Sequence, residues 1–384
     1  MPYDTTRHSA EALDVATYRE ALPLSELVRQ ILAADDLEHF VRRDSNFYPD
    51  LMTRLSETLR RAFGEGCDEA RFQAHRALYY LYEENLREPR PGEGLNQFHP
   101  LVIRLRNEIE QAWETFEQSR LNCLKVDMPE DVETFAAFFE ERCYAHKLWT
   151  HPLFDFLEEQ ATREEMVDFF LHEGTLILRF CDLVVLSMVG AGDEVRRELA
   201  NNFWDEVGGG DFQNRHTELY KRLLRHAGID LATGTGLTSA LMEKLGWQGL
   251  SGYNLYLNFA LHRRNYFKSV GALGAGEMMD PPQYERIVKG CQRVGLGDSK
   301  AIAYYSGHSE MDVGHGEAWL TGVVNPLIRR HPEARRDIMA GALLRVQTTA
   351  DYYDALFAKL TRRNAQADSS FGAVGWSRAA AIGL

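Results

Sequence analysis

Apolar residues recur at helical spacing along most of this 384-residue chain, and that periodicity limits the possible folds more than any other feature. Within residues 69–85, for example, Ala74, Leu78 and Leu81 lie on one side of a helix. No Asn-Gly or Asp-Gly pair separates two alternating apolar runs, so the sequence does not indicate a β-hairpin. The pattern therefore predicts an all-α protein.

Proline, glycine and capping residues divide this pattern into separate helices. The prolines and glycines of residues 87–94 predict a loop, and the three glycines at 208–210 predict a break. Thr162 and Glu165 have the spacing of a capping box, which opens a helix expected to continue through Leu183. The helices predicted in this way cover residues 54–62, 69–85, 99–119, 131–143, 162–189, 193–207, 214–226, 253–279, 283–294, 300–325 and 333–360.

The pattern also indicates two helical regions and a tail. Residues 1–125 form a smaller N-terminal region, and residues 126–362 form a larger and more apolar bundle. Residues 363–384, rich in Ala, Ser and Gly, are expected to be a C-terminal tail. The N-terminal region has amphipathic helices but too few residues for a large core of its own. Its apolar faces are therefore expected to pair with a second copy, which predicts a homodimer.

Charge and cysteine content exclude several classes of protein. Lys and Arg number 43 against 57 Asp and Glu, a net charge of −14 that argues against nucleic acid or an anionic membrane surface as partner. The five cysteines form no C-x-x-C, so neither a disulfide framework nor a thiolate zinc site is indicated. The N-terminus is polar, and the most apolar stretch, residues 176–189, is too short and too charged to cross a bilayer. A cytoplasmic protein is expected.

The segment of residues 308–315 is the most informative about function, because it contains His308, Asp312 and His315. They are spaced at i, i+4 and i+7, so their side chains share one face of a helix. Two imidazoles and one carboxylate are suitable ligands for a divalent first-row metal. The alternative is a solvated polar face that meets no metal, and this motif alone does not decide between the two.

Three more candidate ligands lie on other helices. Glu206 comes just before the three glycines and His216 follows ten residues later, so a kink between them can turn both toward one point. Glu277 ends an apolar helix. Each also has an ordinary structural interpretation, as a helix-end carboxylate, a surface histidine or a frayed helix end.

As a set, three carboxylates and three imidazoles without a thiolate favour Fe(II) or Mn(II) over structural zinc. Six ligands are too many for one open catalytic metal, so two metals fit better. The ferritin-like di-iron pattern is disfavoured because the chain has no Glu-x-x-His.

In order and spacing, these residues resemble the ligand set of haem-oxygenase-like di-iron oxidases and oxygenases. The resemblance covers roughly residues 150–330, and its most specific part is the His308-x-x-x-Asp312-x-x-His315 element. The N-terminal helices resemble the dimerisation region of the N-oxygenating members, typified by that of the streptozotocin pathway. That streptozotocin-pathway relative also carries a C-terminal metal-binding cupin domain, which is not expected here because the chain ends soon after Leu360.

The resemblance implies a haem-oxygenase-like helical bundle that binds two Fe(II) ions and uses O2 as co-substrate. A carboxylate of the set could bridge the metals, and the same carboxylates are the expected catalytic groups because they could take up a substrate proton. The electron donor is left open. One iron would be held by Glu206, His216 and His315, and the other by Glu277, His308 and Asp312.

The reaction implied by the resemblance is oxygen transfer to the nitrogen of a small amine, guanidine or aminoheterocycle, giving a hydroxylamine, nitroso or nitro product. A di-iron oxidase that cleaves C–C bonds of, or desaturates, an amino or fatty acid is the alternative. A non-enzymatic helical interaction protein with solvated histidines and acids is a third.

Several further polar residues have open roles. The streptozotocin-pathway relative carries an extra carboxylate on the first core helix, at a position that falls near Phe180 in this chain, and the nearest acids are Asp182 and Glu173. Either could be an additional ligand or a partner of Arg179. Five residues on core helices could orient a polar substrate, although packing and surface roles are the favoured interpretation: Arg263, Arg264, Tyr266, Tyr304 and Tyr305.

Overall fold

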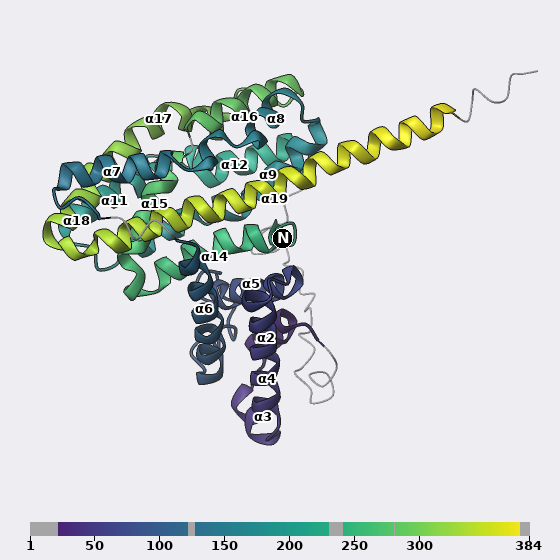
Figure 1. Ribbon diagram of the computed structural model, residues 1–384, viewed down its shortest axis with the longest axis vertical. Coiled ribbons are helices and arrows are strands. Elements are labelled where there is room, and N and C mark those ends of the chain that lie inside the picture. The colour runs from purple at the N-terminus through teal and green to yellow at the C-terminus, as the bar shows by residue number, and fades with distance from the viewer. Residues whose placement is uncertain (1–21, 122–126, 230–240, 280, 377–384) are drawn as a thin grey trace, which may run out of the picture.

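The computed structural model describes residues 22–121, 127–229, 241–279 and 281–376, without the side chains of residues 279, 281–282, 308–315 and 363–376. Within these residues every regular element is a helix and no strand is formed (Figure 1). The all-α prediction is confirmed. In the same described part of the chain, no helix is long and apolar enough to cross a membrane.

The N-terminal helices form a small lobe beside a larger bundle (Figure 1). The amphipathic helix α2 buries Leu27, Val28 and Ile31, and packs against α5. The apolar pattern did not predict α2 and α3. It placed the start of the next helix at residue 54, seven residues after the observed start at Phe47. The lobe consists of α2 (Leu24–Ala33), α3 (Leu37–Arg43), α4 (Phe47–Leu59), the short π-helix η1 (Arg60–Gly64), α5 (Asp68–Glu83) and α6 (Pro100–Arg120).

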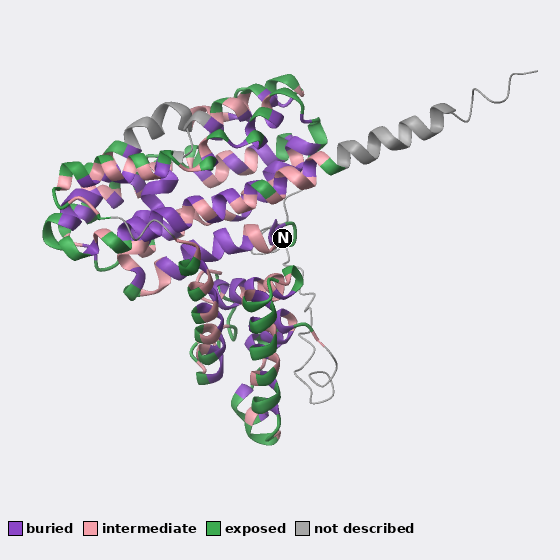
Figure 2. Cartoon of the chain, in the orientation of Figure 1, coloured by how far each residue is buried: buried purple, intermediate pink, exposed green. Residues whose placement is uncertain are grey.

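The larger bundle contains the remaining helices, and the faces that α14, α15 and α19 turn toward one another are buried (Figure 2). Its helices are α7 (Val132–Tyr144), α8 (Pro152–Glu159), α9 (Arg163–Ile177), α10 (Phe180–Met188), α11 (Asp193–Glu206), α12 (His216–His226), α14 (Trp247–Leu261), α15 (Tyr266–Met279), α16 (Pro281–Arg293), α17 (Ala303–Trp319), α18 (Asn325–Arg330) and α19 (Arg335–Trp376).

Local signals placed several of these helix ends correctly. The capping box that opens α9 is present: Glu165 N donates to Thr162 Oγ1 at 3.3 Å, and Thr162 N donates to Glu165 Oε2 at 2.8 Å. The triple-glycine break after α11 is also present, with positive φ at all three residues. At the C-terminal end, α19 continues to Trp376, past the predicted end at residue 360.

Two predicted helices are each split in two. The helix predicted over 162–189 is interrupted at Leu178 and Arg179, between α9 and α10. The helix predicted over 253–279 is interrupted at His262, whose backbone is extended (φ −103°, ψ 116°). The Asn265 side chain there donates to Asn258 Oδ1 at 2.8 Å. This bond between two side chains links the helices on either side of the break, and a pattern of apolar spacing does not reveal it.

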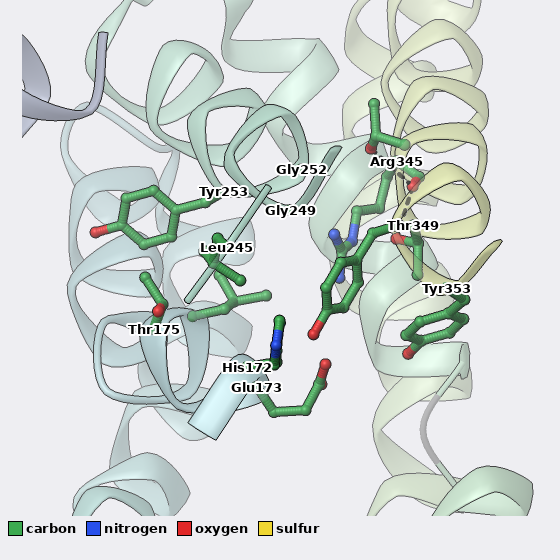
Figure 3. A pocket seen from close by; sticks show the side chains of 13 residues that line it. His172, Glu173, Thr175, Leu245, Gly249, Gly252, Tyr253, Arg345, Thr349 and Tyr353 are labelled. Carbon is green, nitrogen blue, oxygen red and sulfur yellow. Dashed lines mark hydrogen bonds between the residues drawn. The ribbon is translucent and has the colours of Figure 1, made fainter. Parts of the chain in front are cut away.

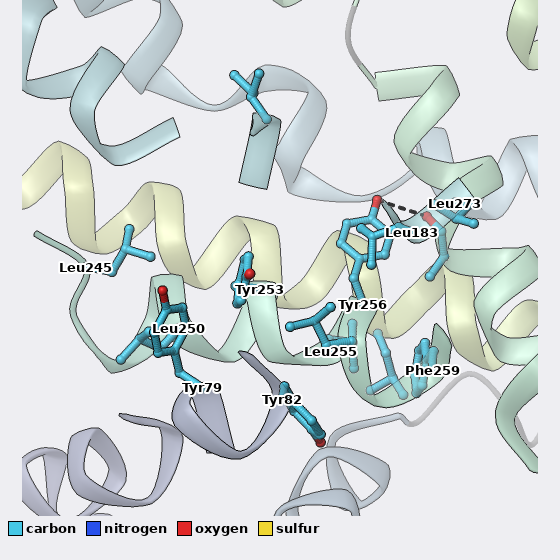
Figure 4. Close-up of a cluster of buried hydrophobic side chains, with 14 of the residues drawn as sticks. Tyr79, Tyr82, Leu183, Leu245, Leu250, Tyr253, Leu255, Tyr256, Phe259 and Leu273 are labelled. Atoms are coloured by element: carbon cyan, nitrogen blue, oxygen red, sulfur yellow. Dashed lines mark hydrogen bonds between the residues drawn. The ribbon is translucent and has the colours of Figure 1, made fainter. Parts of the chain in front are cut away.

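The lobe is attached to the bundle through α5 and α14. Tyr79 and Tyr82 of α5 lie beside α14 (Figure 4), and the ring centroids of Tyr79 and Tyr253 are 5.5 Å apart. Glu83 of α5 accepts hydrogen bonds from the Tyr253 hydroxyl at 2.6 Å and from Arg179 Nη2 at 2.7 Å. The apolar face of α5 is therefore covered by the same chain, so it does not itself require a second copy. The homodimer stays a prediction.

Candidate metal centre

Three glycines bring Glu206 and His216 together. Gly208, Gly209 and Gly210 have φ values of 83°, 60° and 91°, which L-residues with a side chain rarely adopt. A Cβ on Gly208 would also lie 2.3 Å from a backbone oxygen. Because the chain can turn here, α11 ends at Glu206 and α12 begins at His216. Their side chains meet, with His216 Nδ1 3.0 Å from Glu206 Oε1.

This pair lies in a largely buried environment. The His216 side chain is 6% exposed and that of Glu206 11%. The His216 ring meets the Tyr304 ring of α17 edge-on, with centroids 6.1 Å apart. On α10, burial and, to a smaller extent, the nearby Glu206 charge raise the pKa of the Cys181 thiol to about 11. Helices α10, α11, α12 and α17 therefore all border the pair.

Glu277 approaches the same region from α15. It is buried, and its Oε1 accepts a hydrogen bond from Asn202 Nδ2 at 3.1 Å. Asn202 precedes Glu206 by four residues on α11, so both lie on one helical face. Glu277 and Glu206 are thus aligned along the same side of α11.

Helix α17 passes directly beside Glu277. A Cβ on Gly316 of α17 would lie 3.1 Å from Met278 Cγ and 4.0 Å from the Glu277 carbonyl oxygen. About one turn later on α17, Trp319 Nε1 donates to Val270 O of α15 at 3.0 Å. The backbone of α17 is helical through His308, Asp312 and His315, whose side chains lie outside the described residues.

The donors available here fit iron. Carboxylate oxygens and imidazole nitrogens suit Fe(II), and the described side chains contribute Glu206, His216 and Glu277. Among the described side chains, no three His, Cys, Asp or Glu residues are close enough to hold one metal ion. The other three predicted ligands are spaced along α17, the helix that packs against both α12 and α15.

Residues 167–350 match the family of iron-containing redox enzymes. This match supports the haem-oxygenase-like superfamily, whose helical fold agrees with the structure, and an iron-binding oxidoreductase activity. The matched segment contains α11, α12, α15 and α17, and so all six predicted ligands. No curated protein is significantly similar to the chain.

Within the matched segment, the arginines predicted as possible substrate-orienting residues make structural contacts. Arg263 donates to Val189 O at 2.5 Å and lies over the Tyr266 ring. Arg264 reaches the N-terminal lobe, where it pairs with Glu114 at 2.8 Å. Unlike these arginines, the two tyrosines of α17 lie close to the candidate metal centre. Tyr304 and Tyr305 are buried in an aromatic cluster that includes Tyr220 and Tyr284, next to His216.

The two acids near Phe180 have different surroundings. Asp182 pairs with Arg179 at 3.4 Å. Glu173 does not pair with Arg179 and lies in a pocket between α9, α14 and α19 (Figure 3). Neither this pocket nor the contact between Asn202 and Glu277 was predicted from the sequence. The spacing of Asn202 and Glu206 was a local signal that could have identified Asn202, whereas the pocket has no such signal.

Proposed function

We propose that the protein is a non-haem di-iron, O2-dependent N-oxygenase. It would convert the nitrogen of a small amine, guanidine or aminoheterocycle to a hydroxylamine, nitroso or nitro group. The observation that carries the proposal is the buried Glu206–His216 pair, 3.0 Å apart, beside Glu277 and the helix that bears the His-x-x-x-Asp-x-x-His motif. That arrangement lies within the segment matching the iron-containing redox enzymes.

Two irons held by Glu206, His216, Glu277 and the three α17 residues would supply electrons to O2. The chain itself positions the ligands and excludes water. Asn202 donates to Glu277 Oε1, which restricts the orientation of that carboxylate. The buried Tyr304 ring covers one side of His216.

Oxygen transfer to nitrogen requires a neutral nitrogen with an available lone pair. Carboxylates near the reacting atoms can accept the proton that an amine or guanidine must lose. The N-terminal helical lobe, which resembles that of N-oxygenating relatives, supports this reaction over C–C cleavage.

Iron binding is the first test. After anaerobic loading with Fe(II), we expect about two Fe per chain, with at least one lost in His308→Ala or His315→Ala, since losing a ligand sharply weakens affinity. His216→Ala should behave in the same way. His226→Ala is the matched control because His226 is exposed at the other end of α12. Elemental analysis that finds full iron in all three ligand variants would contradict the assignment.

The second test is the fate of oxygen. The iron-loaded protein is incubated with ¹⁸O2, a reductant and candidate amines, and products are analysed by mass spectrometry. We expect label in an N–O bond, and we expect Glu277→Ala to abolish it. Glu285→Ala, at an exposed position on α16, should retain activity. An alkene or aldehyde without any N–O product would favour the C–C-cleaving alternative instead.

A further inference from the structure

Two exposed aromatic side chains flank the turn that brings Glu206 and His216 together. Trp204, two residues before Glu206, is 55% exposed, and Phe212, within the turn, is 62% exposed. The Trp204 ring extends along the turn, since a Cβ on Gly210 would lie 3.2 Å from Trp204 Cη2. A single exposed aromatic residue is ordinary, whereas two beside a candidate metal centre indicate a surface that another protein covers.

Basic residues border these two aromatic side chains. The Arg215 guanidinium lies over the Phe212 ring, 3.4 Å from its centroid, and Arg222 Nη2 donates to Gln213 O at 3.1 Å. Arg222 and Lys221 lie on the side of α12 opposite its buried residues. Among the described residues, none of these three cations has a carboxylate within 4 Å. Their charges are therefore available to an anionic partner.

Charge also distinguishes this surface from the rest of the molecule. Residues 204–226 contain four Lys and Arg and, apart from Glu206, three acids, whereas the whole chain has a net charge of −14. Of these acids, Glu218 is paired with Arg225 at 2.9 Å, and Asp211 accepts hydrogen bonds within its own turn. An acidic protein would therefore be repelled by the chain as a whole and attracted here, which orients its approach.

We propose that this surface docks a small acidic one-electron carrier of the ferredoxin class. Trp204 and Phe212 form the centre of the docking surface, and Arg215, Lys221 and Arg222 form its rim. Tryptophan and arginine are the side chains that contribute most where interfaces are small, and redox complexes have small interfaces. A second copy of this chain is a poorer occupant, because a two-fold interface would place the same basic residues opposite one another.

The inference rests on the proposed function, because iron that gives electrons to O2 must have them returned. Each reduced carrier loses one electron from its cluster, so two encounters convert two Fe(III) to two Fe(II). The docking surface suits this transfer, since electron transfer slows steeply with distance. Trp204 is two residues from Glu206, and Arg215 is adjacent to His216.

Calorimetry with the full chain and a plant-type [2Fe–2S] ferredoxin tests the docking independently of the iron chemistry. We expect binding with and without iron, weakened about tenfold or more as salt rises from about 20 to about 200 mM. Trp204→Ala should weaken binding about tenfold. Tyr48→Ala, at an exposed aromatic position of the lobe, is the matched control and should bind as the wild type does. Absent binding, or equal affinity of Trp204→Ala and the wild type, would overturn the proposal.

Charge reversal is a second variant, which keeps the test decisive if Trp204→Ala folds poorly. Lys221→Glu/Arg222→Glu should weaken binding at least about tenfold and reduce its dependence on salt. Arg42→Glu/Arg43→Glu changes the net charge equally on exposed residues of α3, at the end of the lobe away from the bundle (Figure 1), and should retain wild-type affinity. Equal weakening in both double variants would refute the proposed surface. So would a loss of dimer by light scattering in Lys221→Glu/Arg222→Glu with ferredoxin affinity unchanged, which would identify a subunit interface.

Anaerobic stopped-flow mixing connects docking with iron reduction. Reduced ferredoxin is mixed with the Fe(III)-loaded protein, and its oxidation is followed by its visible absorbance. We expect Trp204→Ala to slow this oxidation about tenfold, whereas reduction by dithionite, a small molecule that needs no docking surface, should be unaffected. Ferredoxin that binds as expected but is never oxidised would contradict the proposed iron chemistry and support the docking site. Reduction by dithionite without any ferredoxin binding would overturn the docking site alone.

Discussion

His75 is a buried ionisable side chain between the N-terminal lobe and the bundle. Its ring stacks on Trp247 with centroids 6.3 Å apart and meets Trp113 edge-on at 5.1 Å. Burial lowers the pKa of His75 to about 3, and the Arg71 charge contributes in the same direction. The folded protein therefore keeps this imidazole neutral at pH values where an exposed histidine is charged.

This makes stability depend on pH in a defined direction. The unfolded chain binds a proton at His75 below about pH 6.5, whereas the folded chain does not do so until about pH 3. The free energy of unfolding should therefore fall as pH drops through this window, by up to about 1.4 kcal/mol per pH unit from this residue alone. In urea unfolding between pH 6.5 and 5, His75→Phe should show a smaller slope than the wild type. His39→Phe, at an exposed position, should keep the wild-type slope; an unchanged slope in His75→Phe would contradict the assignment.

The crossing of α15 and α19 depends on two glycines. A Cβ on Gly271 would lie 1.8 Å from Ile338 O, and one on Gly341 would lie 1.9 Å from Lys268 O. In both cases the obstructing atom belongs to the backbone of the facing helix, so a side-chain rotation cannot relieve the clash. The two helices consequently pack as closely as their backbones allow, and this contact holds the Glu277 helix in place.

Gly271→Ala should therefore destabilise the protein even though alanine is the better helix former. We expect a loss of about 1–3 kcal/mol or more, because overpacking forces the backbones of α15 and α19 apart. Thermal unfolding monitored by circular dichroism measures this effect. Gly64→Ala is the matched control: the nearest atom to its added Cβ is 4.0 Å away, so stability should stay constant or rise. Equal melting temperatures for Gly271→Ala and the wild type would show that the two helices can separate at little cost.

The two lobes depend on each other through buried polar contacts. Besides the Glu83 contacts, the Tyr82 hydroxyl donates to Glu110 Oε1 at 2.9 Å, and His262 Nε2 lies 2.8 Å from the same oxygen. Asn258 Nδ2 donates to the Tyr82 hydroxyl at 3.3 Å. Removing the N-terminal lobe would leave these bundle residues without their partners and expose the face of α14 that α5 covers.

Deletion of residues 1–125 should therefore give an insoluble or partly unfolded fragment. The full chain should elute as a homodimer in size-exclusion chromatography with light scattering. A monomeric full chain would contradict the predicted assembly. A soluble fragment of residues 126–384 with native helical content and cooperative unfolding would show that the bundle folds without the lobe.

Contacts between residues close in the chain are predictable because their physical causes are local. Helical periodicity, the Thr162 capping box and the glycine break after Glu206 all involve residues within a few positions of one another. The candidate metal ligands could be predicted for the same reason, because they are histidines and acids at recognisable spacings along the chain. Which of these side chains come into contact depends on packing. A turn in the chain is enough to bring Glu206 and His216 together, whereas Glu277 comes from a helix much farther along the chain.

Tertiary structure decided the rest. The interruption between α9 and α10 lies where Arg179 binds Glu83 of a different lobe, and no residue near Arg179 in the sequence signals that partner. Likewise, Glu173 shares a pocket with Arg345 because α9, α14 and α19 pack together. The same carboxylate could have been a metal ligand, an ion-pair partner or a pocket residue. Its surroundings are set by long-range packing, which turns a helix face toward one neighbour or another and leaves no local pattern.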